Sequence, residues 1–496
     1  MAGSHFFAGH ALAMLFALGP SVAQVHPPAY PSAIPSATQC LQKKGGDWTY
    51  ALPCYVEAVR EQPLNYRKAA DQMIGSIQTH QFELHSQSWS PEGATTPSSW
   101  LHSVSIFIPQ GIPYRTAILV IDGGTRHPQP EGAPPKEGMW SKAVLAQLAE
   151  RTQSVVVHVS DVPNQYLQWA DGIYRTEDGS VAHSWALALR EGPEAAFASL
   201  HLPMAAAAIR AMDLAEHELT HLQVNRFIVT GISKRGWATW FTALADDRVA
   251  AIAPAVIEVL DTNSLIERTR RHFGGHWPVA FYDYASAGVL RERHTPAFAR
   301  LMKLEDPLEY LSTAQGSERL SVPKYIISAS GDDFFLPDSA RHFISRLPGP
   351  TLLRAIPQAD HEIGGAQVPE LIVPFVKRIQ NNLPLPHPLP SIDPTDESDK
   401  RVIFNEQPSA LIQWTAFNPR SRDFRYACGI RYEPRTIQPQ GSRQPVVSTG
   451  WTATFVEARF ADGLSLTSPI RISPDTRYPQ VPPANSSPAC STLPDS

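Results

Sequence analysis

Short apolar runs alternate with longer helical patterns between about residues 40 and 383. Residues 116–121 (TAILVI) and 154–159 (SVVVHV) are continuous apolar runs, as the strands of a buried parallel sheet require. Residues 203–219 begin with proline and continue with strong helix formers, which predicts a helix. Further strands are predicted at 103–108, 226–230, 249–256, 324–330 and 352–356, and a last helix at 368–379. Strands alternating with helices predict an α/β fold, a mostly parallel sheet with helices on both faces.

Two segments depart from this rhythm. Residues 261–320 are rich in Arg, His and aromatic residues, and insertions at the C-terminal edge of such sheets commonly build binding sites. We expect a helical cap insertion over the active site there, with a peripheral insertion as the alternative. Residues 384–400 (PLPHPLPSIDPTDESDK) predict a stiff linker. Residues 401–496 predict a small C-terminal all-β sandwich, with strands at 402–404, 411–417, 424–432, 451–459 and 470–472.

The first 23 residues have the pattern of a signal peptide. An apolar run at 6–18 is too short to span a bilayer comfortably, and Ser21-Val22-Ala23 supplies small residues for cleavage near Ala23. The start lacks Lys and Arg, so an uncleaved anchor or a poorly ordered apolar start is the alternative. A Pro-rich linker is expected at 24–39. The signal peptide predicts that the chain is exported, either periplasmic or secreted. No later stretch predicts a transmembrane span in the mature chain, which is therefore expected to be soluble.

Composition narrows the function classes. Of 496 residues, 43% are hydrophobic and 18% are charged, with a net charge of −5, which excludes a disordered chain and argues against nucleic acid as a partner. The 46 prolines gather partly after residue 383. The four cysteines fit an oxidising compartment and allow three pairings, of which we favour the local one, Cys40–Cys54 and Cys428–Cys490. Their spacing does not suggest zinc, and neither a metal nor a cofactor is expected.

The sharpest chemical motif is Val229-Thr-Gly-Ile-Ser-Lys-Arg-Gly-Trp237, which follows a predicted strand and opens a helical pattern. Gly-x-Ser in that context is the first half of a nucleophile elbow, a tight turn that presents Ser233 above the sheet. The second glycine of the usual G-x-S-x-G comes one residue late, at Gly236. An ordinary helix-capping serine is the alternative.

The residues that follow have the order of an α/β-hydrolase triad, which is Ser, then acid, then His. The strand at 324–330 leads into Asp332 and Asp333, and either could be the acid, with Asp332 preferred. The strand at 352–356 leads into His361, which we expect to be the general base. A surface histidine is the alternative.

An oxyanion hole needs two N–H donors. The backbone N–H of Lys234 follows the nucleophile, and Gly124 lies in the Asp122-Gly123-Gly124 loop after the strand at 116–121. A plain turn is the alternative for that loop. The side chains of Lys234 and Arg235 could assist an anionic substrate or the oxyanion, or could be solvated or salt-bridged surface charges.

The chain resembles the PhoPQ-activated pathogenicity-related protein family. The matching stretches are SQSWSP (86–91), ILVIDGG (118–124), EDGSVAHSWAL (177–187), LPMAAAAIRAMD (202–213), TGISKRGWATW (230–240), GGHWPVAFYDY (274–284), EDPLEYL (305–311), SGDDFFLPDS (330–339) and IQWTAFNPRSRDFRY (412–426). This resemblance implies an exported α/β-hydrolase-like domain followed by a β domain, supports Ser233, Asp332 and His361 as the triad, and does not imply a substrate. The elbow is also locally similar to that of glucuronoyl esterases, which have a basic residue directly after the serine.

The resulting hypothesis is an exported serine hydrolase, esterase or peptidase-like, with a domain at 40–383 that holds the site. Its substrate would be a small molecule, a carbohydrate ester or a peptide. The alternative is a non-catalytic binding or signalling protein on the same scaffold, since fold alone does not imply catalysis. A third hypothesis adds carbohydrate anchoring through the C-terminal β domain. The sequence does not indicate an oligomeric state.

Overall fold

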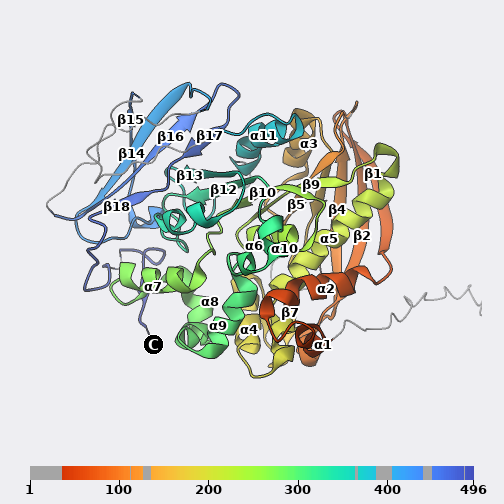
Figure 1. Ribbon diagram of the computed structural model, residues 1–496, viewed down its shortest axis with the longest axis horizontal. Helices are drawn as coiled ribbons and strands as arrows, with labels where there is room; N and C mark the ends of the chain where they lie inside the picture. Colours follow the sequence, from red (N-terminus) through yellow and green to blue (C-terminus); the bar gives the residue numbers. More distant parts are fainter. Residues whose placement is uncertain are drawn as a thin grey trace, which may run out of the picture. The chain divides into compact units, whose positions relative to one another are not determined.

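The computed structural model describes residues 36–111, 113–126, 136–363, 367–386, 405–438, 449–484 and 486–495 (Figure 1). The predicted signal peptide and most of both predicted linkers lie outside these residues. The linker expected at 24–39 ends earlier than predicted, because a helix capped by Ser36 already begins at Ala37. Among the described residues, no helix is both long and apolar enough to cross a membrane.

A nine-stranded sheet forms the centre of the α/β part of the chain. Its strands, in spatial order, are β1 (Asn65–Ile74), β2 (Ile77–Ser88), β4 (Ser99–Ile108), β6 (Val156–Val159), β5 (Thr116–Ile121), β9 (Arg226–Ile232), β10 (Val249–Ala255), β12 (Lys324–Ala329) and β13 (Thr351–Ile356). The first three pair antiparallel, and the six from β6 to β13 run parallel. The predicted mostly parallel sheet is confirmed, and the antiparallel β1 and β2 extend it.

The parallel strands are buried on both faces, which explains their continuous apolar sequences. In β5, Leu119 and Ile121 join one hydrophobic core while Ile118 and Val120 join the other. The helices are α1 (Ala37–Gln42), α2 (Ala51–Arg60), α3 (Lys142–Thr152), α4 (Glu177–Ala188), α5 (His201–Glu218), α6 (Lys234–Ala245), α7 (Thr262–His272), α8 (Tyr282–Ser286), α9 (Pro296–Glu305), α10 (Ala314–Arg319) and α11 (Gln367–Gln380). Helices α2, α5 and α6 pack in the first core, and α3 and α11 in the second.

The strand order contains a topological switch point at β5. After β5 the chain forms β6 on one side and then returns to form β9 on the other side of β5. At such a switch point, the loops after the strands diverge and leave room for a ligand at their carboxyl ends. A small three-stranded sheet consists of β3 (Thr95–Thr96), β7 (Leu167–Trp169) and β8 (Tyr174–Arg175). Its strands come from the connections between β2 and β4 and between β6 and β9.

The expected helical cap insertion lies between β10 and β12. It contains α7 to α10 and the two-residue strand β11 (Trp277–Pro278), drawn in green in Figure 1. Because it leaves the sheet at the carboxyl end of β10, it starts from the same edge of the sheet as the loops at the switch point. Its residues Phe281, Phe298 and Leu301 are buried in the first core, so the insertion is packed onto the α/β part.

A separate antiparallel sheet lies near the C-terminus (Figure 1, blue). Its strands are β14 (Ala410–Asn418), β15 (Glu433–Thr436), β16 (Trp451–Arg459), β17 (Ser465–Thr467) and β18 (Arg471–Ser473). Leu411, Val456 and Leu466 share a core with Leu352 and Phe375 of the α/β part. The layer that faces this sheet is therefore supplied by β13 and α11. The strand expected at 424–432 is wrong, because that segment is a loop with a 3-10 turn at Tyr426–Cys428.

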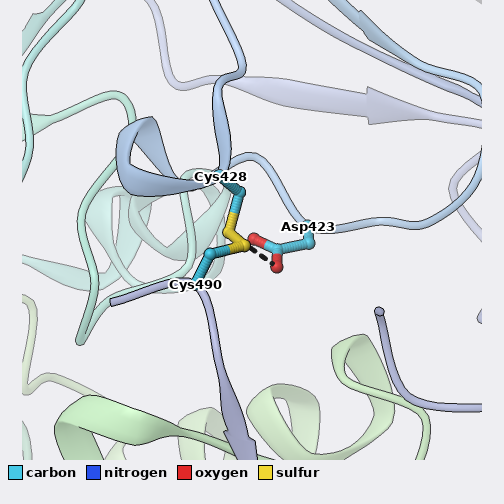
Figure 2. A group of neighbouring side chains, drawn as sticks. All are labelled: Asp423, Cys428 and Cys490. Atoms are coloured by element: carbon cyan, nitrogen blue, oxygen red, sulfur yellow. Dashed lines mark hydrogen bonds between the residues drawn. A yellow bond between two sulfur atoms is a disulfide. The ribbon is translucent and has the colours of Figure 1, made fainter. Parts of the chain in front are cut away.

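Both disulfides have the favoured pairing, Cys40–Cys54 and Cys428–Cys490. Figure 2 shows the Asp423 carboxylate pointing at the second disulfide, with Oδ2 3.3 Å from Cys428 Sγ. These three side chains could suggest a metal site, but the two sulfurs are bonded to each other, and the carboxylate is paired with Arg425 Nη2 at 2.8 Å. Asp423, Cys428 and Cys490 therefore form a structural disulfide with a neighbouring ion pair and not a metal site.

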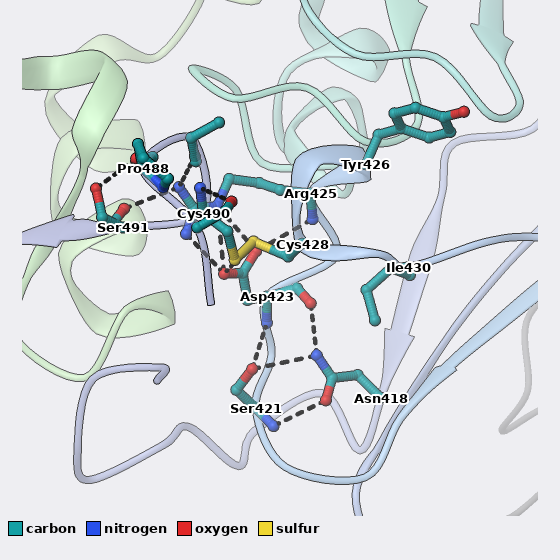
Figure 3. The surroundings of a disulfide bond; sticks show 12 residues. Asn418, Ser421, Asp423, Arg425, Tyr426, Cys428, Ile430, Pro488, Cys490 and Ser491 are labelled. Carbon is teal, nitrogen blue, oxygen red and sulfur yellow. Dashed lines mark hydrogen bonds and ion pairs between the residues drawn. A yellow bond between two sulfur atoms is a disulfide. The ribbon is translucent and has the colours of Figure 1, made fainter. Parts of the chain in front are cut away.

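This disulfide fastens the end of the chain to the C-terminal β region (Figure 3). The segment after Cys490 forms β19 (Thr492–Leu493), which pairs antiparallel with β11 of the insertion. Asp495 then accepts hydrogen bonds from Arg270 Nε at 2.5 Å and from Trp277 Nε1 at 3.1 Å. The C-terminal segment thus connects the cap insertion to the β region.

Candidate active site

Ser233 lies on a strained turn between β9 and α6. Its φ of 57° and ψ of −127° are unusual for a residue with a side chain, as at a nucleophile elbow. A Cβ on Gly231 would lie 2.4 Å from the Arg235 carbonyl oxygen, and one on Gly236 would lie 2.6 Å from Ile257 Cγ2. The turn thus needs glycine at both positions. The close approach falls at Gly236, which explains why the second glycine comes one residue late.

Three of the predicted site residues meet in one hydrogen-bonded chain. Ser233 Oγ lies 2.8 Å from His361 Nε2, and His361 Nδ1 lies 3.1 Å from each carboxylate oxygen of Asp332. Ser233 follows β9, Asp332 follows β12 and His361 follows β13. Because these strands are parallel, all three residues lie at the carboxyl edge of the sheet. Of the two candidate acids, Asp332 is the one that contacts His361.

The surroundings of Asp332 hold its carboxyl group in a fixed orientation. Its side chain is buried, and Oδ1 accepts hydrogen bonds from the backbone N–H of Phe334 at 2.7 Å and of Phe335 at 3.1 Å. The neighbouring Asp333 differs: burial, followed by the charge of Asp332, raises its pKa to about 6. The loop after β12 therefore contains one oriented carboxylate and one that is easily protonated.

His361 is poised to accept a proton. Burial disfavours the imidazolium, but the charge of Asp332 and its hydrogen bond outweigh that effect and raise the pKa of His361 above 6.5. The ring of Phe334 lies against the imidazole, with centroids 4.6 Å apart. Phe334 in turn faces Phe281 of the cap insertion, 6.1 Å away. An aromatic wall therefore runs from the insertion to the histidine.

The loop after β5 is held in a fixed shape. The Asp122 carboxylate accepts the N–H of Gly123 at 2.8 Å, of Met139 at 2.9 Å and of Trp140 at 3.1 Å. Gly124 has a φ of 124°, and its N–H has no acceptor among the residues that the structure describes. The N–H of Lys234 is the first of α6, where no intrahelical acceptor exists. The N–H groups of Lys234 and Gly124, the two predicted oxyanion donors, are thus not used in helix or sheet hydrogen bonds within the described part of the chain.

The side chains of Lys234 and Arg235 are buried and paired. Arg235 forms a bidentate ion pair with Glu177, at 2.6 and 2.8 Å, and Lys234 Nζ lies 2.9 Å from Glu177 and 3.0 Å from Asp178. They are salt-bridged, as one alternative expected, but they lie in the interior instead of at the surface. Glu177 and Asp178 were not predicted as site residues, although they begin the EDGSVAHSWAL stretch.

A third carboxyl group lies within electrostatic reach of Asp332. Glu258, which follows β10, is buried, and its burial together with the charge of Asp332 raises its pKa well above the usual value. A glutamate in the short segment between a strand and the insertion offers no sequence pattern by which it could have been recognised.

The sheet topology and the Ser-His-Asp chain at its carboxyl edge define an α/β-hydrolase-like protein. The chain belongs to the PhoPQ-activated pathogenicity-related protein family, whose model matches residues 52–425, and the resemblance inferred from the sequence is confirmed.

Known proteins similar to this chain fall into two groups. Autocrine proliferation repressor protein A of Dictyostelium discoideum is 30% identical over 433 residues, covering 79% of this chain and 84% of that protein. Among solved structures, acetyl xylan esterase 1 from a Thermoanaerobacterium species has 13% identity and a TM-score of 0.42, covering 65% of this chain and 90% of that one. The glucuronoyl esterase from Solibacter usitatus has 12% identity and a TM-score of 0.38, covering 64% and 86%. Likeness at this level says nothing about a substrate.

Proposed function

We propose that the protein is an exported serine hydrolase that transfers an acyl group to water. The observation that supports this most is the hydrogen-bonded chain Ser233–His361–Asp332 on a strained elbow. Such a turn costs stability and persists where the surrounding structure enforces it, as at active sites. The two disulfides agree with export to an oxidising compartment, into which the signal peptide at 1–23 would direct the chain.

The mechanism follows from the role of each group. His361 Nε2 accepts the hydroxyl proton as Ser233 Oγ attacks the substrate carbonyl carbon. Asp332 orients the imidazole and stabilises the imidazolium that forms. The backbone N–H groups of Lys234 and Gly124 would donate to the oxyanion. His361 then gives its proton to the leaving group, and water repeats the sequence on the acyl-serine to release the acid and restore Ser233.

The substrate class stays broad. Small-molecule esters, carbohydrate esters and peptides all react through this mechanism, and the ion pairs of Lys234 and Arg235 leave neither cation unpaired for an anionic substrate. The relative named an autocrine proliferation repressor favours a second candidate, a non-catalytic signalling protein on the same scaffold.

Labelling with a fluorophosphonate distinguishes the two candidates, because an activated serine displaces fluoride from phosphorus and keeps the phosphonyl group. We expect the folded wild-type protein to be labelled at Ser233 and the Ser233→Ala variant to be unlabelled, as read by gel fluorescence and peptide mass. Circular dichroism would verify that both are folded. A folded wild type that resists labelling, or equal labelling of Ser233→Ala, would contradict the proposed hydrolase.

The pH dependence of hydrolysis should follow the ionisation of His361. The general base acts in its neutral form, so kcat/KM falls as pH drops through the pKa of this residue. Since that pKa is raised above 6.5, the acid limb for a neutral ester should have its midpoint above pH 6.5. Initial rates between about pH 5 and 9 would measure it. A midpoint below 6.5 would show that burial outweighs the effect of the Asp332 charge on His361.

A further inference from the structure

The carboxylate of Glu177 connects the two segments that supply the proposed oxyanion donors. One segment is the elbow, with Lys234 and Arg235, and the other is the loop after β5, with Gly124. Glu177 is the first residue of α4 and does not contact the triad in the structure. It nevertheless contacts the elbow directly and is linked to the loop after β5 through Gln165.

On the elbow side, Glu177 binds both residues that follow the nucleophile. Arg235 Nη1 donates to Oε2 at 2.6 Å and Nη2 to Oε1 at 2.8 Å, while Lys234 Nζ lies 2.9 Å from Oε2. The Nε of Arg235 donates to the Val162 carbonyl oxygen at 2.5 Å. The first turn of α6, and with it the N–H of Lys234, is thereby fixed against this carboxylate.

On the loop side, the connection runs through Gln165. Its amide Nε2 donates to Glu177 Oε1 at 2.6 Å and to the Gly124 carbonyl oxygen at 2.9 Å, and its Oε1 accepts the Glu177 backbone N–H at 3.1 Å. Gln165 is completely buried. The Arg235 guanidinium also packs under the loop, because a Cβ on Gly123 would lie 2.8 Å from Nη2. Glu177 and Gln165 together thus connect the elbow to the peptide of Gly124.

Two features show that the position of Glu177 is tightly constrained. The two Glu177 oxygens accept from four donor groups, which uses the whole accepting capacity of a carboxylate. Glu177 also has a φ of 51°, in the left-handed region that residues with side chains avoid. Surrounding structure must therefore hold it in place, as it does for Ser233.

We propose that Glu177 is a positioning residue that sets the distance between the Lys234 and Gly124 N–H groups, so that both reach the oxyanion. This inference rests on the proposed function and deepens it. The carboxylate acts through Arg235, Lys234 and Gln165 and does not touch the substrate. Its effect should appear where charge develops on the substrate oxygen, in the transition state more than in the bound substrate.

The test compares Glu177→Gln with a matched control, Glu406→Gln. Glu406 also forms a bidentate ion pair with a buried arginine, Arg378, at 2.7 and 2.8 Å, but it lies outside the site. For p-nitrophenyl acetate, we expect Glu177→Gln to lower kcat by about 10- to 100-fold with KM changed by less than about 2-fold. The inhibition constant of phenylboronic acid, which forms a tetrahedral adduct with the serine, should rise by a similar factor. Glu406→Gln should leave both unchanged.

A second variant tests the route. Gln165→Met removes the hydrogen bond to the Gly124 carbonyl oxygen and the two hydrogen bonds with Glu177 but leaves the Arg235 ion pair, and it should also lower kcat. The double variant Gln165→Met/Glu177→Gln should lose little more than the larger single effect, because both interrupt one connection. Thermal melting of every variant separates the kinetic effect from lost stability.

The outcomes are distinct. If Glu177→Gln melts earlier but keeps the kcat of Glu406→Gln, or if it raises KM alone, Glu177 is not a positioning residue for the oxyanion hole. If the wild type is folded but neither hydrolyses esters nor binds the boronic acid, the proposed hydrolase fails, and this inference fails with it. Active wild type with unaffected variants overturns only the inference.

Discussion

Replacing Asp332 by asparagine should lower kcat/KM for a p-nitrophenyl ester by about 10³- to 10⁴-fold. The amide cannot stabilise the imidazolium, and its NH₂ group can face His361 Nδ1 and favour the wrong tautomer. The hydrogen bonds from Phe334 and Phe335 N–H to Oδ1 would survive, so the loop should keep its shape. Without the Asp332 charge, the pKa of His361 should fall, and any residual activity should extend to lower pH. Steady-state rates against pH measure both effects.

Asp333→Asn is the matched control, one residue away in the same buried loop. Because its raised pKa of about 6 already makes this carboxyl easy to protonate, we expect the amide to change kcat/KM by less than about 10-fold. If Asp332→Asn kept most of the activity, another acid would have to serve His361. Glu258, which is buried within electrostatic reach of Asp332, would then be the first to test with Glu258→Gln.

The meeting of Ser233, His361 and Asp332 could be predicted because its signals in the sequence are local. Ser233, Asp332 and His361 each come shortly after an apolar run, and such runs form parallel strands whose carboxyl ends share one edge. The order of the three residues along the chain and the Gly-x-Ser turn supplied the rest. The choice between Asp332 and Asp333 could not be made from the sequence. Adjacent residues in a loop point in different directions, and the sequence pattern does not show which of the two faces His361.

The connection through Glu177 could not be predicted. Gln165 and Glu177 flank the very short strands β7 and β8, which show neither an apolar run nor an alternation. Their partners Gly124 and Arg235 lie 41 and 58 residues away along the chain. A buried polar network of this kind is specified by tertiary contacts, and the sequence contains only its separate members.

Strand β1 at the edge of the sheet was not predicted, and the segment at 424–432 was predicted wrongly, for different reasons. Strand β1 is largely exposed along its middle, so its sequence, NYRKAADQMI, lacks the apolar pattern of a core strand. The segment at 424–432 has strand-forming aromatic residues, but Gly429 adopts a φ of 82°, and Cys428 is fixed to Cys490. The backbone N–H of Arg425 also donates to the Asp423 carboxylate at 3.1 Å and not to a neighbouring strand.

Arg422 is the buried charge that joins the C-terminal region to the site-bearing part of the chain. Its side chain is fully buried and donates to His272 Nε2 at 2.8 Å and to Asp338 Oδ2 at 3.0 Å. Burial, opposed by Asp338 and reinforced by the Arg422 charge, lowers the pKa of His272 to about 3, so the neutral ring can accept this hydrogen bond. The carbonyl oxygens of Pro474 and Asp475 accept from Nη1, both at 3.0 Å.

Replacing Arg422 by methionine should therefore lower the free energy of unfolding by about 3–5 kcal/mol, because it leaves Asp338 buried without its cation. Guanidinium chloride unfolding followed by tryptophan fluorescence measures the change. Arg341→Met is the matched control: Arg341 pairs with Asp475 through two 2.8 Å contacts, but that carboxylate is 53% exposed, so the loss should be about 0–1 kcal/mol. If Arg422→Met does not fold, Arg422→Lys retains the charge and should lose less. Equal losses for Arg422 and Arg341 would show that burial of the pair is not what stabilises this junction.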